Sequence, residues 1–180
     1  TSGAAGDQNP MFMSTYNQDH PDTQDEGIGG YAILDVQARR LGEEIVRLVK
    51  SIKNTDQTVQ IWSKKTSVTC EGQERKYPRN PDEPRGGYLA PTNDIALAGV
   101  AAEVFTEIGV HLKETSRFDR TMMVTVMANA IGYIPTDAAY LMPSEKALGN
   151  SLKPGCAEPA MIDAFVQLMD EYIALNQKAN

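Results

Sequence analysis

The sequence predicts a mixed α/β domain whose sheet is largely buried and flanked by helices. Three observations support this class. Apolar residues recur every three or four positions over 31–53, two nearly continuous apolar runs cover 94–105 and 120–134, and a second helical pattern opens at Pro159. The outer two patterns are typical of amphipathic helices, and the middle two of strands covered on both faces. With 180 residues, 41% of them hydrophobic, the chain is long enough for one such domain.

The remaining elements follow in order along the chain. Residues 1–28 hold many turn formers and little apolar periodicity, so we expect a long loop there. The β-branched and aromatic stretch 57–70 predicts a strand with one face in solvent, and the proline- and charge-rich stretch 71–88 predicts a surface insertion. Within the run that ends at 105, the period changes to that of a helix beginning near Glu103.

The charge balance and the cysteines limit the function classes. A net charge of -7 argues against nucleic acid or an anionic membrane as the partner, because both require a basic face. No apolar run approaches the length of a membrane-spanning helix, so we do not expect a transmembrane protein. Cys70 and Cys156 fit neither a metal knuckle nor a C-x-x-C motif; they could form a disulfide or remain as two buried thiols. His111 is interpreted as a surface residue of a helix.

Polar side chains occur where the two apolar runs end, and open sheets bind ligands at the carboxyl ends of their strands. Glu103 could bind a metal or act as a general base there, or it could only complement the dipole of the following helix. The second run ends in a polar and aromatic cluster that includes Tyr133, Asp137 and Tyr140. This cluster could form a site, or it could make a turn and cap the core.

The first residue offers a third candidate. Hydrolases with an N-terminal nucleophile expose Ser, Thr or Cys by self-cleavage, and the freed amine acts as the base. Thr1 is compatible with this chemistry, and it is equally compatible with a proteolytic nick. An N-terminal-nucleophile hydrolase, in which Thr1 attacks and Asp7 or Asn9 supports it, is therefore kept as an alternative function.

Four collinear segments together resemble the neutral/alkaline, non-lysosomal ceramidase family. They are GAAGDQNP at 3–10, LAGVAAEVFTEIGVHLKE at 97–114, NAIGYIPTDAAY at 129–140 and PGCAEPAMIDAFVQLM at 154–169. The first is similar to the G-D-x-x-P turn found mid-chain in those enzymes, and the third to their N-x-x-x-x-Y-x-x-T-x-x-x-Y stretch. The resemblance implies that residues 1–180 form the C-terminal part of one ceramidase-like catalytic domain, with 1–28 as an active-site loop region and with a sheet completed by an N-terminal half outside this chain.

The resemblance also implies a zinc-dependent hydrolase that cleaves an amide (N-acyl) bond. In the family, two histidines from the earlier half hold the zinc together with a glutamate and a tyrosine, which fall here on Glu103 and Tyr140. Zinc with nitrogen and oxygen ligands and one open position activates water or polarises a carbonyl group. Tyr133 would lie nearby as a hydrogen-bond donor, and Asp7 and Asn9 would border the cavity.

The implied partner is the N-terminal half of the same precursor, which would carry the zinc histidines. We therefore expect a processed, secreted or periplasmic heteromer that acts on a small-molecule or lipid amide. Two departures from the family leave the acyl and amine parts of the substrate open: the serine of the family's turn is replaced by Gln8 and Asn9, and its Y-E-G-A-S-T stretch by LMPSEKALGNS. A non-catalytic binding protein on the same fold is a further alternative.

Overall fold

The computed structural model describes residues 3–8, 28–53, 55, 58–72, 86–91, 94–127, 132–141 and 150–179. The chain divides into two compact units. One consists of Thr1–Gln8 and Val59–Asn180, and the other of Asn9–Thr58. The first of these, called the sheet unit below, carries every described strand.

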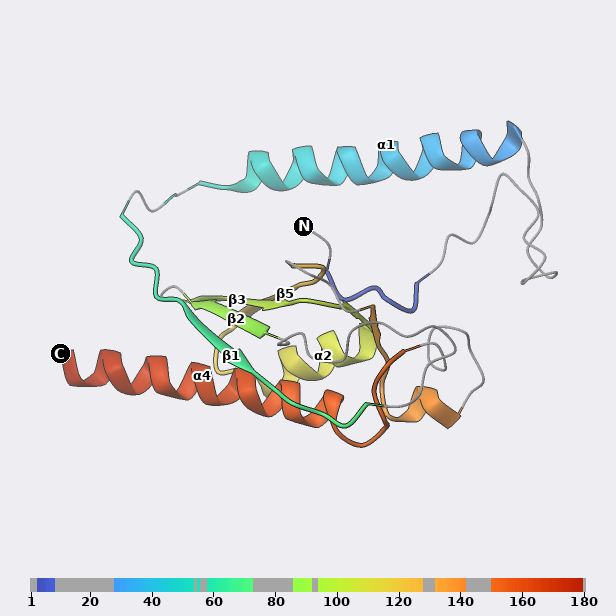
Figure 1. Cartoon of the computed structure of the whole chain (residues 1–180). Coiled ribbons are helices and arrows are strands. Elements are labelled where there is room, and N and C mark those ends of the chain that lie inside the picture. The colour runs from blue at the N-terminus through green and yellow to red at the C-terminus, as the bar shows by residue number, and fades with distance from the viewer. Residues whose placement is uncertain are drawn as a thin grey trace. The chain divides into compact units, whose positions relative to one another are not determined.

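The smaller unit contains helix α1, which spans Ile28–Ser51 (Figure 1). It confirms the helix predicted over 31–53. The helical period of its apolar residues is the reason for this agreement, because such a stripe is a local signal that needs no partner strand to be recognised. Glu44 and Arg47 form an ion pair of 2.6 Å within one turn of the helix.

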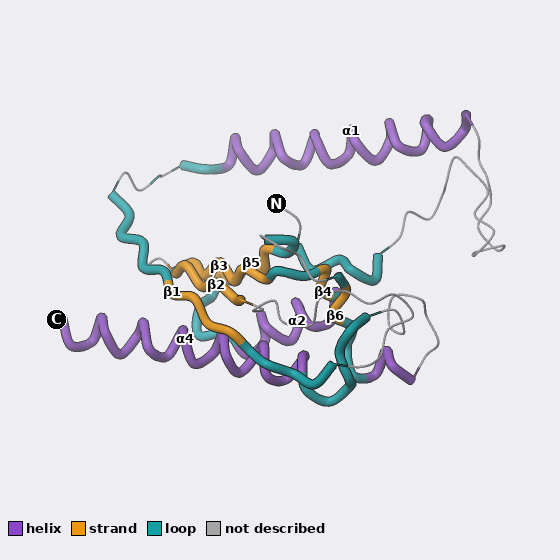
Figure 2. The backbone as a smooth tube through the Cα atoms, viewed as in Figure 1, coloured by secondary structure: helices purple, strands orange, loops and turns teal. Residues whose placement is uncertain are grey.

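The main sheet of the sheet unit has four strands in the order β1-β2-β3-β5 (Figure 2). They span Lys64–Ser67, Gly86–Pro91, Ile95–Val100 and Arg120–Val124. The pairs β1–β2 and β2–β3 are antiparallel, whereas β3–β5 is parallel. A parallel pair needs a crossover connection, and helix α2 (Thr106–Thr115) lies in it. The strand predicted at 57–70 is thus confirmed only over its central residues, and most of the insertion predicted at 71–88 lies outside the described residues.

A second, two-stranded parallel sheet pairs β4 (Glu103–Val104) with β6 (Tyr133–Ile134). The two apolar runs are therefore each divided between two sheets, and the prediction of one continuous strand per run was wrong. The helix also begins later than the predicted Glu103. The N–H groups of Glu103 and Phe105 donate to the carbonyl oxygens of Gly132 and Ile134 at 2.8 and 3.0 Å, and these strand bonds keep the chain extended up to Phe105.

The core lies between the main sheet and the two helices α2 and α4 (Ala157–Ala179), which Figure 1 shows on one side of that sheet. Its buried members include Ala96, Ala98, Ile108, Leu112, Met123, Phe165, Leu168 and Met169. On the opposite face, Leu97 is 40% exposed and Met122 is 55% exposed. The prediction that both strands are covered on both faces was therefore wrong at these two positions. Strands with one open face alternate in burial, as β5 does, whereas β3 alternates only up to Ala98 and is buried on both faces from there to Val100.

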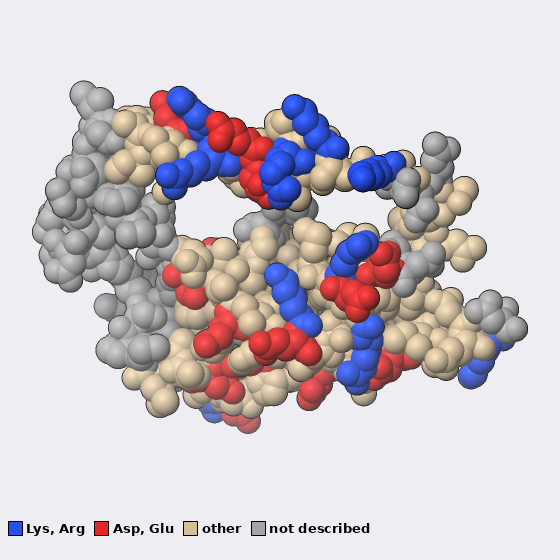
Figure 3. All heavy atoms as spheres, turned by 180° about the vertical axis from the view of Figure 1, so that it is seen from behind, with Lys and Arg blue, Asp and Glu red and all other residues tan. Residues whose placement is uncertain are grey.

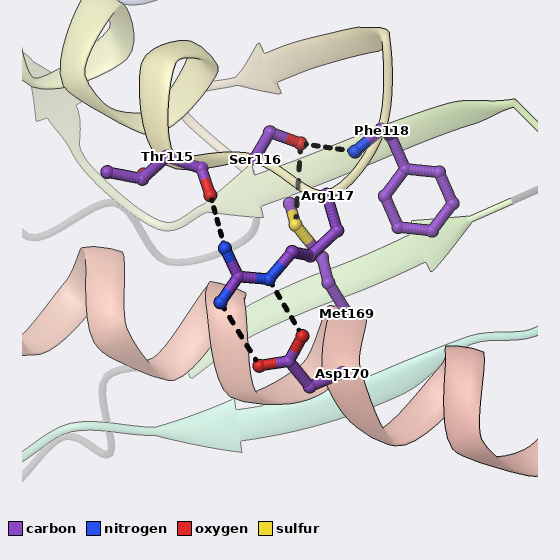
Figure 4. A network of polar contacts seen from close by, with 6 residues as sticks. All are labelled: Thr115, Ser116, Arg117, Phe118, Met169 and Asp170. Atoms are coloured by element: carbon purple, nitrogen blue, oxygen red, sulfur yellow. Dashed lines mark hydrogen bonds and ion pairs between the residues drawn. The ribbon is translucent and has the colours of Figure 1, made fainter.

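The two helices are tied to each other at the end of α2 (Figure 4). Arg117 donates from Nε to Asp170 of α4 at 2.9 Å, and the Ser116 hydroxyl donates to the sulfur of Met169 at 3.5 Å. The Phe118 N–H in turn donates to Ser116 Oγ at 3.0 Å. These contacts end α2 and set the direction of the chain toward β5.

A disulfide joins Cys70 to Cys156 across a sequence separation of 86 residues. It links the segment after β1 to the residue before α4. Of the two possibilities that the sequence left open, a disulfide or two buried thiols, the structure has the disulfide. Figure 3 shows acidic and basic side chains interspersed over one face of the described surface. Within the described residues, no helix is both long and apolar enough to cross a bilayer.

Candidate functional site

Glu103 and Tyr133 lie opposite each other in the small parallel sheet, as register partners of β4 and β6. The Tyr133 hydroxyl lies within reach of the Glu103 carboxylate, which can accept a hydrogen bond from it. Partial burial, the charge of Glu103 and this hydrogen bond together raise the pKa of Tyr133 above its ordinary value. Tyr133 therefore keeps its proton at neutral pH. The sequence placed Tyr133 near Glu103 only through the family resemblance, and the structure brings the two side chains into contact.

The segment Gly3–Gln8 lies along the side of β4 that does not face β6. The Gly6 N–H donates to the Val104 carbonyl oxygen at 2.7 Å, and the Thr125 hydroxyl donates to the Gly3 carbonyl oxygen at 3.0 Å. A Cβ atom on Gly6 would lie 2.6 Å from the carbonyl oxygen of Glu103, so only glycine allows this approach. The glycine of the G-D turn therefore packs on the backbone that carries Glu103.

Asp7 caps the start of α2. Its Oδ1 accepts hydrogen bonds from both the N–H and the hydroxyl of Thr106, each at 2.7 Å. The local N-cap position is Phe105, which has no side chain able to do this, so the cap comes from the other end of the chain. Partial burial acts to raise the pKa of Asp7, but the hydrogen bonds from Thr106 and from its own turn outweigh it and lower that pKa. The charge of Asp7 also complements the positive end of the helix dipole.

Tyr140 lies in the short 3-10 helix η1 (Ala138–Leu141). Its single hydroxyl hydrogen is shared between the side-chain oxygen of Asn150 and the carbonyl oxygen of Leu152, each 3.0 Å from the hydroxyl oxygen. Burial is the main cause that raises the pKa of Tyr140. A phenolate at this place would face two acceptor oxygens at hydrogen-bond distance, which is unfavourable. Binding a metal through this oxygen would require the hydroxyl to leave Asn150 and Leu152.

Two residues with central contacts were missed by the sequence reasoning. Asn150 is 1% exposed, and besides Tyr140 its Oδ1 accepts from the Leu152 N–H at 2.7 Å.

Glu158, in the first turn of α4, accepts from the Asp137 N–H at 2.8 Å and contacts His111 Nδ1 at 2.9 Å. Glu158 has the position of an ordinary first-turn acid, so no local signal distinguishes it. The interpretation of His111 as a surface residue agrees with its side chain being 45% exposed.

A metal would find part of a ligand set here. Among the described residues, no three His, Cys, Asp or Glu side chains gather as a complete centre requires. Glu103 fits the role of an oxygen ligand, because its carboxylate is held by a neutral donor, Tyr133. Tyr140 fits less well in its present hydrogen bonding. The other two predicted site residues, Thr1 and Asn9, lie outside the described residues.

Comparisons with known proteins find partial structural similarity to ceramidases. No family model matches the chain, and no curated protein is significantly similar to it. A solved structure described as ceramidase complexed with C2 is 16% identical with a TM-score of 0.43, and the match covers 52% of this chain and 15% of that one. A neutral ceramidase from Pseudomonas aeruginosa is 17% identical with a TM-score of 0.38, and the match again covers 52% of this chain and 15% of that one. The match thus spans about half of this chain and a small part of two longer proteins.

Proposed function

We propose that this chain is part of a zinc-dependent hydrolase that cleaves an amide (N-acyl) bond. The observation that carries the proposal is the contact between Glu103 and Tyr133, which follow the carboxyl ends of the parallel strands β3 and β5 along the chain. Ligands of open sheets bind at such strand ends. The four ceramidase-like segments of the sequence support the same chemistry, because Glu103 falls on the family's zinc glutamate.

Each residue of the pair has a distinct part in the proposed reaction. Glu103 would bind the zinc with its carboxylate, and two histidines from the N-terminal half of the precursor would complete the centre. The bound zinc would supply an activated water molecule and polarise the amide carbonyl group. Because its pKa is raised, Tyr133 carries a proton at neutral pH. It could turn this hydroxyl from Glu103 to the carbonyl oxygen of the substrate as negative charge develops there.

The geometry favours Tyr133 over Tyr140 as the tyrosine that acts with Glu103. The hydroxyl of Tyr133 already contacts the carboxylate, whereas that of Tyr140 is bound to Asn150 and Leu152. In this proposal Tyr140 anchors the segment that follows Tyr133. The assignment of Tyr140 as a zinc ligand stays a prediction that the experiment below separates from ours.

The parts proposed for the N-terminal residues follow from the contacts of Asp7. Its two hydrogen bonds to Thr106 make it a positioning residue that fixes the junction between β4 and α2. Catalytic roles for Thr1 and Asn9 stay predictions, and the variant Thr1→Ala tests the N-terminal-nucleophile alternative, which requires a loss of activity at unchanged zinc content. We further propose a secreted or periplasmic location, because disulfides such as Cys70–Cys156 persist mainly in oxidising compartments.

The proposal is tested by removing the charge of Glu103 in the full-length protein. We expect Glu103→Gln to lower amidase activity on a short N-acyl substrate by at least about 100-fold, because a metal-ligating charge is lost. Glu107→Gln is the matched control, since Glu107 is an exposed acid of the next helix and carries the same charge. Full activity of Glu103→Gln would refute the proposal.

A second pair of variants separates the two tyrosines. Tyr133→Phe is expected to lower kcat by about 100- to 1,000-fold while leaving the fold intact, because it removes only the donor near the reacting carbonyl group. Tyr140→Phe should instead destabilise the protein by about 1–3 kcal/mol, because the buried carbonyl oxygen of Leu152 loses this donor and Asn150 Oδ1 keeps only the Leu152 N–H. The measurements are steady-state kinetics and urea unfolding. The reverse pattern would assign the catalytic role to Tyr140.

A further inference from the structure

We propose that Glu158 is a positioning residue that holds Tyr133 against Glu103, acting through Asp137 and with His111 as its second partner. The three contacts Glu158–Asp137, Asp137–Gly155 and Glu158–His111 are called the α4 clamp, and residues 134–136 connect Asp137 to Tyr133. The inference rests on the proposed function only in assigning Tyr133 and Glu103 to the reactive site. The contacts of the α4 clamp are observed in the structure and do not depend on that function.

The clamp is reciprocal. The Asp137 N–H donates to Glu158 Oε2 at 2.8 Å, and the Gly155 N–H donates to Asp137 Oδ1 at 2.7 Å. The turn after β6 and the start of α4 therefore each supply one N–H group and one carboxylate. Two hydrogen bonds that run in opposite directions fix the rotation of one segment against the other as well as the distance between them. Both acceptors are carboxylates, which makes each bond stronger than one between neutral groups.

Glu158 joins three elements. Its side chain is only 14% exposed, and its second oxygen, Oε1, lies 2.9 Å from His111 Nδ1 of α2. A carboxylate this deeply placed is costly unless both of its oxygens are satisfied. The structure satisfies one from α2 and the other from the turn after β6, and so places all three elements around one side chain.

The link from Asp137 to Tyr133 is short and tightly packed. Ile134 is 6% exposed, Thr136 is 4% exposed, and Pro135 is among the fully buried residues. Proline fixes its own φ angle, and buried neighbours cannot shift without opening voids. A displacement of Asp137 is therefore transmitted to Tyr133. His111, the other contact of Glu158, belongs to α2, which begins three residues after Glu103. Glu158 therefore contacts the segment that follows Glu103 as well as the segment that follows Tyr133.

The fold does not need this carboxylate to attach α4. Cys156, two residues before Glu158, is already bonded to Cys70, and Met161, Phe165 and Met169 of α4 are buried in the core. The two contacts of Glu158 instead fix the positions of Asp137 and His111 relative to α4. Residues that orient a ligand or a catalytic group in this way commonly change metal affinity or activity by about 10- to 100-fold when they are lost.

The test compares three variants of the full-length protein. Glu158→Ala removes both arms of the clamp, whereas Glu158→Gln keeps an acceptor for Asp137 and an amide group for His111. Asp170→Ala is the matched control, since it breaks the exposed ion pair of the same helix with Arg117. We expect Glu158→Ala to lower kcat by about 10- to 100-fold at nearly unchanged KM. Glu158→Gln should restore kcat to within about 3-fold of the wild-type value, and Asp170→Ala should leave it unchanged.

A spectroscopic readout separates positioning from mere stability. The ring resonances of Tyr133, assigned with the Tyr133→Phe variant, should shift in Glu158→Ala and return in Glu158→Gln, under conditions where unfolding curves show each protein fully folded. Unchanged Tyr133 resonances in folded Glu158→Ala would overturn the inference. If that variant does not fold, Glu158→Asp replaces it, because a carboxylate shorter by one methylene group cannot keep both the Asp137 N–H and His111 at hydrogen-bond distance. Unchanged resonances there would overturn the inference equally.

The two proposals fail separately. If Tyr133 shifts in Glu158→Ala but Glu103→Gln keeps full activity, the positioning inference stands and the proposed function is refuted. If Glu103→Gln is inactive but Glu158→Ala leaves Tyr133 and kcat unchanged, the function stands and the positioning inference is refuted.

Discussion

Asp7 shows how one side chain can serve an element that is distant in the sequence. It accepts two hydrogen bonds at the start of α2, 99 residues further along the chain. Capping signals are normally sought in the residues next to a helix, and Phe105 at that position offers none. The sequence therefore could not reveal this role, although it did single out Asp7 as a residue near the site.

The cap predicts a pH-dependent contribution to stability. Because the pKa of Asp7 is lower in the folded protein, its contribution is fully present above the unfolded value of about 3.9 and is lost as pH falls through the folded value. Asp7→Ala should lower the free energy of unfolding by about 1 kcal/mol at neutral pH. The measurement is urea unfolding of the wild type and the variant at neutral and at acidic pH.

The control for this prediction is Asp119→Ala, which removes an exposed acid beyond the end of α2. It should show neither the loss at neutral pH nor its pH dependence. A difference between wild type and Asp7→Ala that stays constant, or grows, as the pH falls below about 4 would contradict the capping role.

The partner of Glu103 was also beyond the reach of sequence patterns. The apolar run over 94–105 predicted Glu103 where a strand ends and a helix begins, whereas Glu103 is the first residue of the two-residue strand β4. Periodicity, however, identifies faces of one element and not the register between two. Spacing within the family pattern pointed to Tyr140, whereas the strand register places Tyr133 opposite Glu103. Only the pairing of β4 with β6 supplies this information.

At the scale of elements, the segment Gly3–Gln8 and helix α2 depend on close packing. A Cβ atom on Gly109 of α2 would lie 2.6 Å from the Cβ of Ala4. This contact is too short for two carbon atoms, so the helix needs a glycine where the N-terminal segment crosses it. Helix propensity alone would favour alanine at the same position.

Two glycine-to-alanine variants test this packing. Gly109→Ala should lower the free energy of unfolding by about 1–3 kcal/mol, because the clash outweighs the gain in helix propensity. Gly42→Ala, in α1, meets nothing within 4 Å and should raise it by about 0.5–1 kcal/mol. Chemical denaturation measures both changes. Adding Ala4→Gly to Gly109→Ala should restore most of the loss, and a failure to do so would show that the clash is not with Ala4.

The helices were easier to predict than the strands for a physical reason. An amphipathic helix carries its own period, and the structure has helices at Ile28–Ser51, Thr106–Thr115 and Ala157–Ala179 near the predicted positions. Strands β4 and β6 have two residues each, which is too short for any period. They are defined by their hydrogen bonds to each other and by Gly6, whose N–H donates to Val104. Such long-range pairings leave no trace in a local pattern.

For the whole sheet unit, the disulfide is expected to be a main source of stability. Cys70 and Cys156 are separated by 86 residues, and in the chain-entropy model a loop of this size contributes about 4–5 kcal/mol by restricting the unfolded chain. The Cys70→Ser/Cys156→Ser double variant should therefore unfold at a clearly lower urea concentration than the oxidised wild type.

The control for the disulfide is a reducing agent. It should lower the unfolding midpoint of the wild type toward that of the double variant and should leave the double variant unchanged. Identical midpoints of oxidised wild type and double variant would contradict the assigned stabilising role of the Cys70–Cys156 bond.

The central claim about the whole molecule is that Glu103 contributes to a zinc centre completed from outside this chain. The most direct test is the metal content of the purified full-length protein, measured by mass spectrometry for the wild type and for Glu103→Gln. The account predicts about one zinc per wild-type molecule, as in catalytic sites with a single open position, and a strongly reduced content in Glu103→Gln. Equal zinc content in both proteins, or a wild type that is an active amidase without zinc, would contradict it.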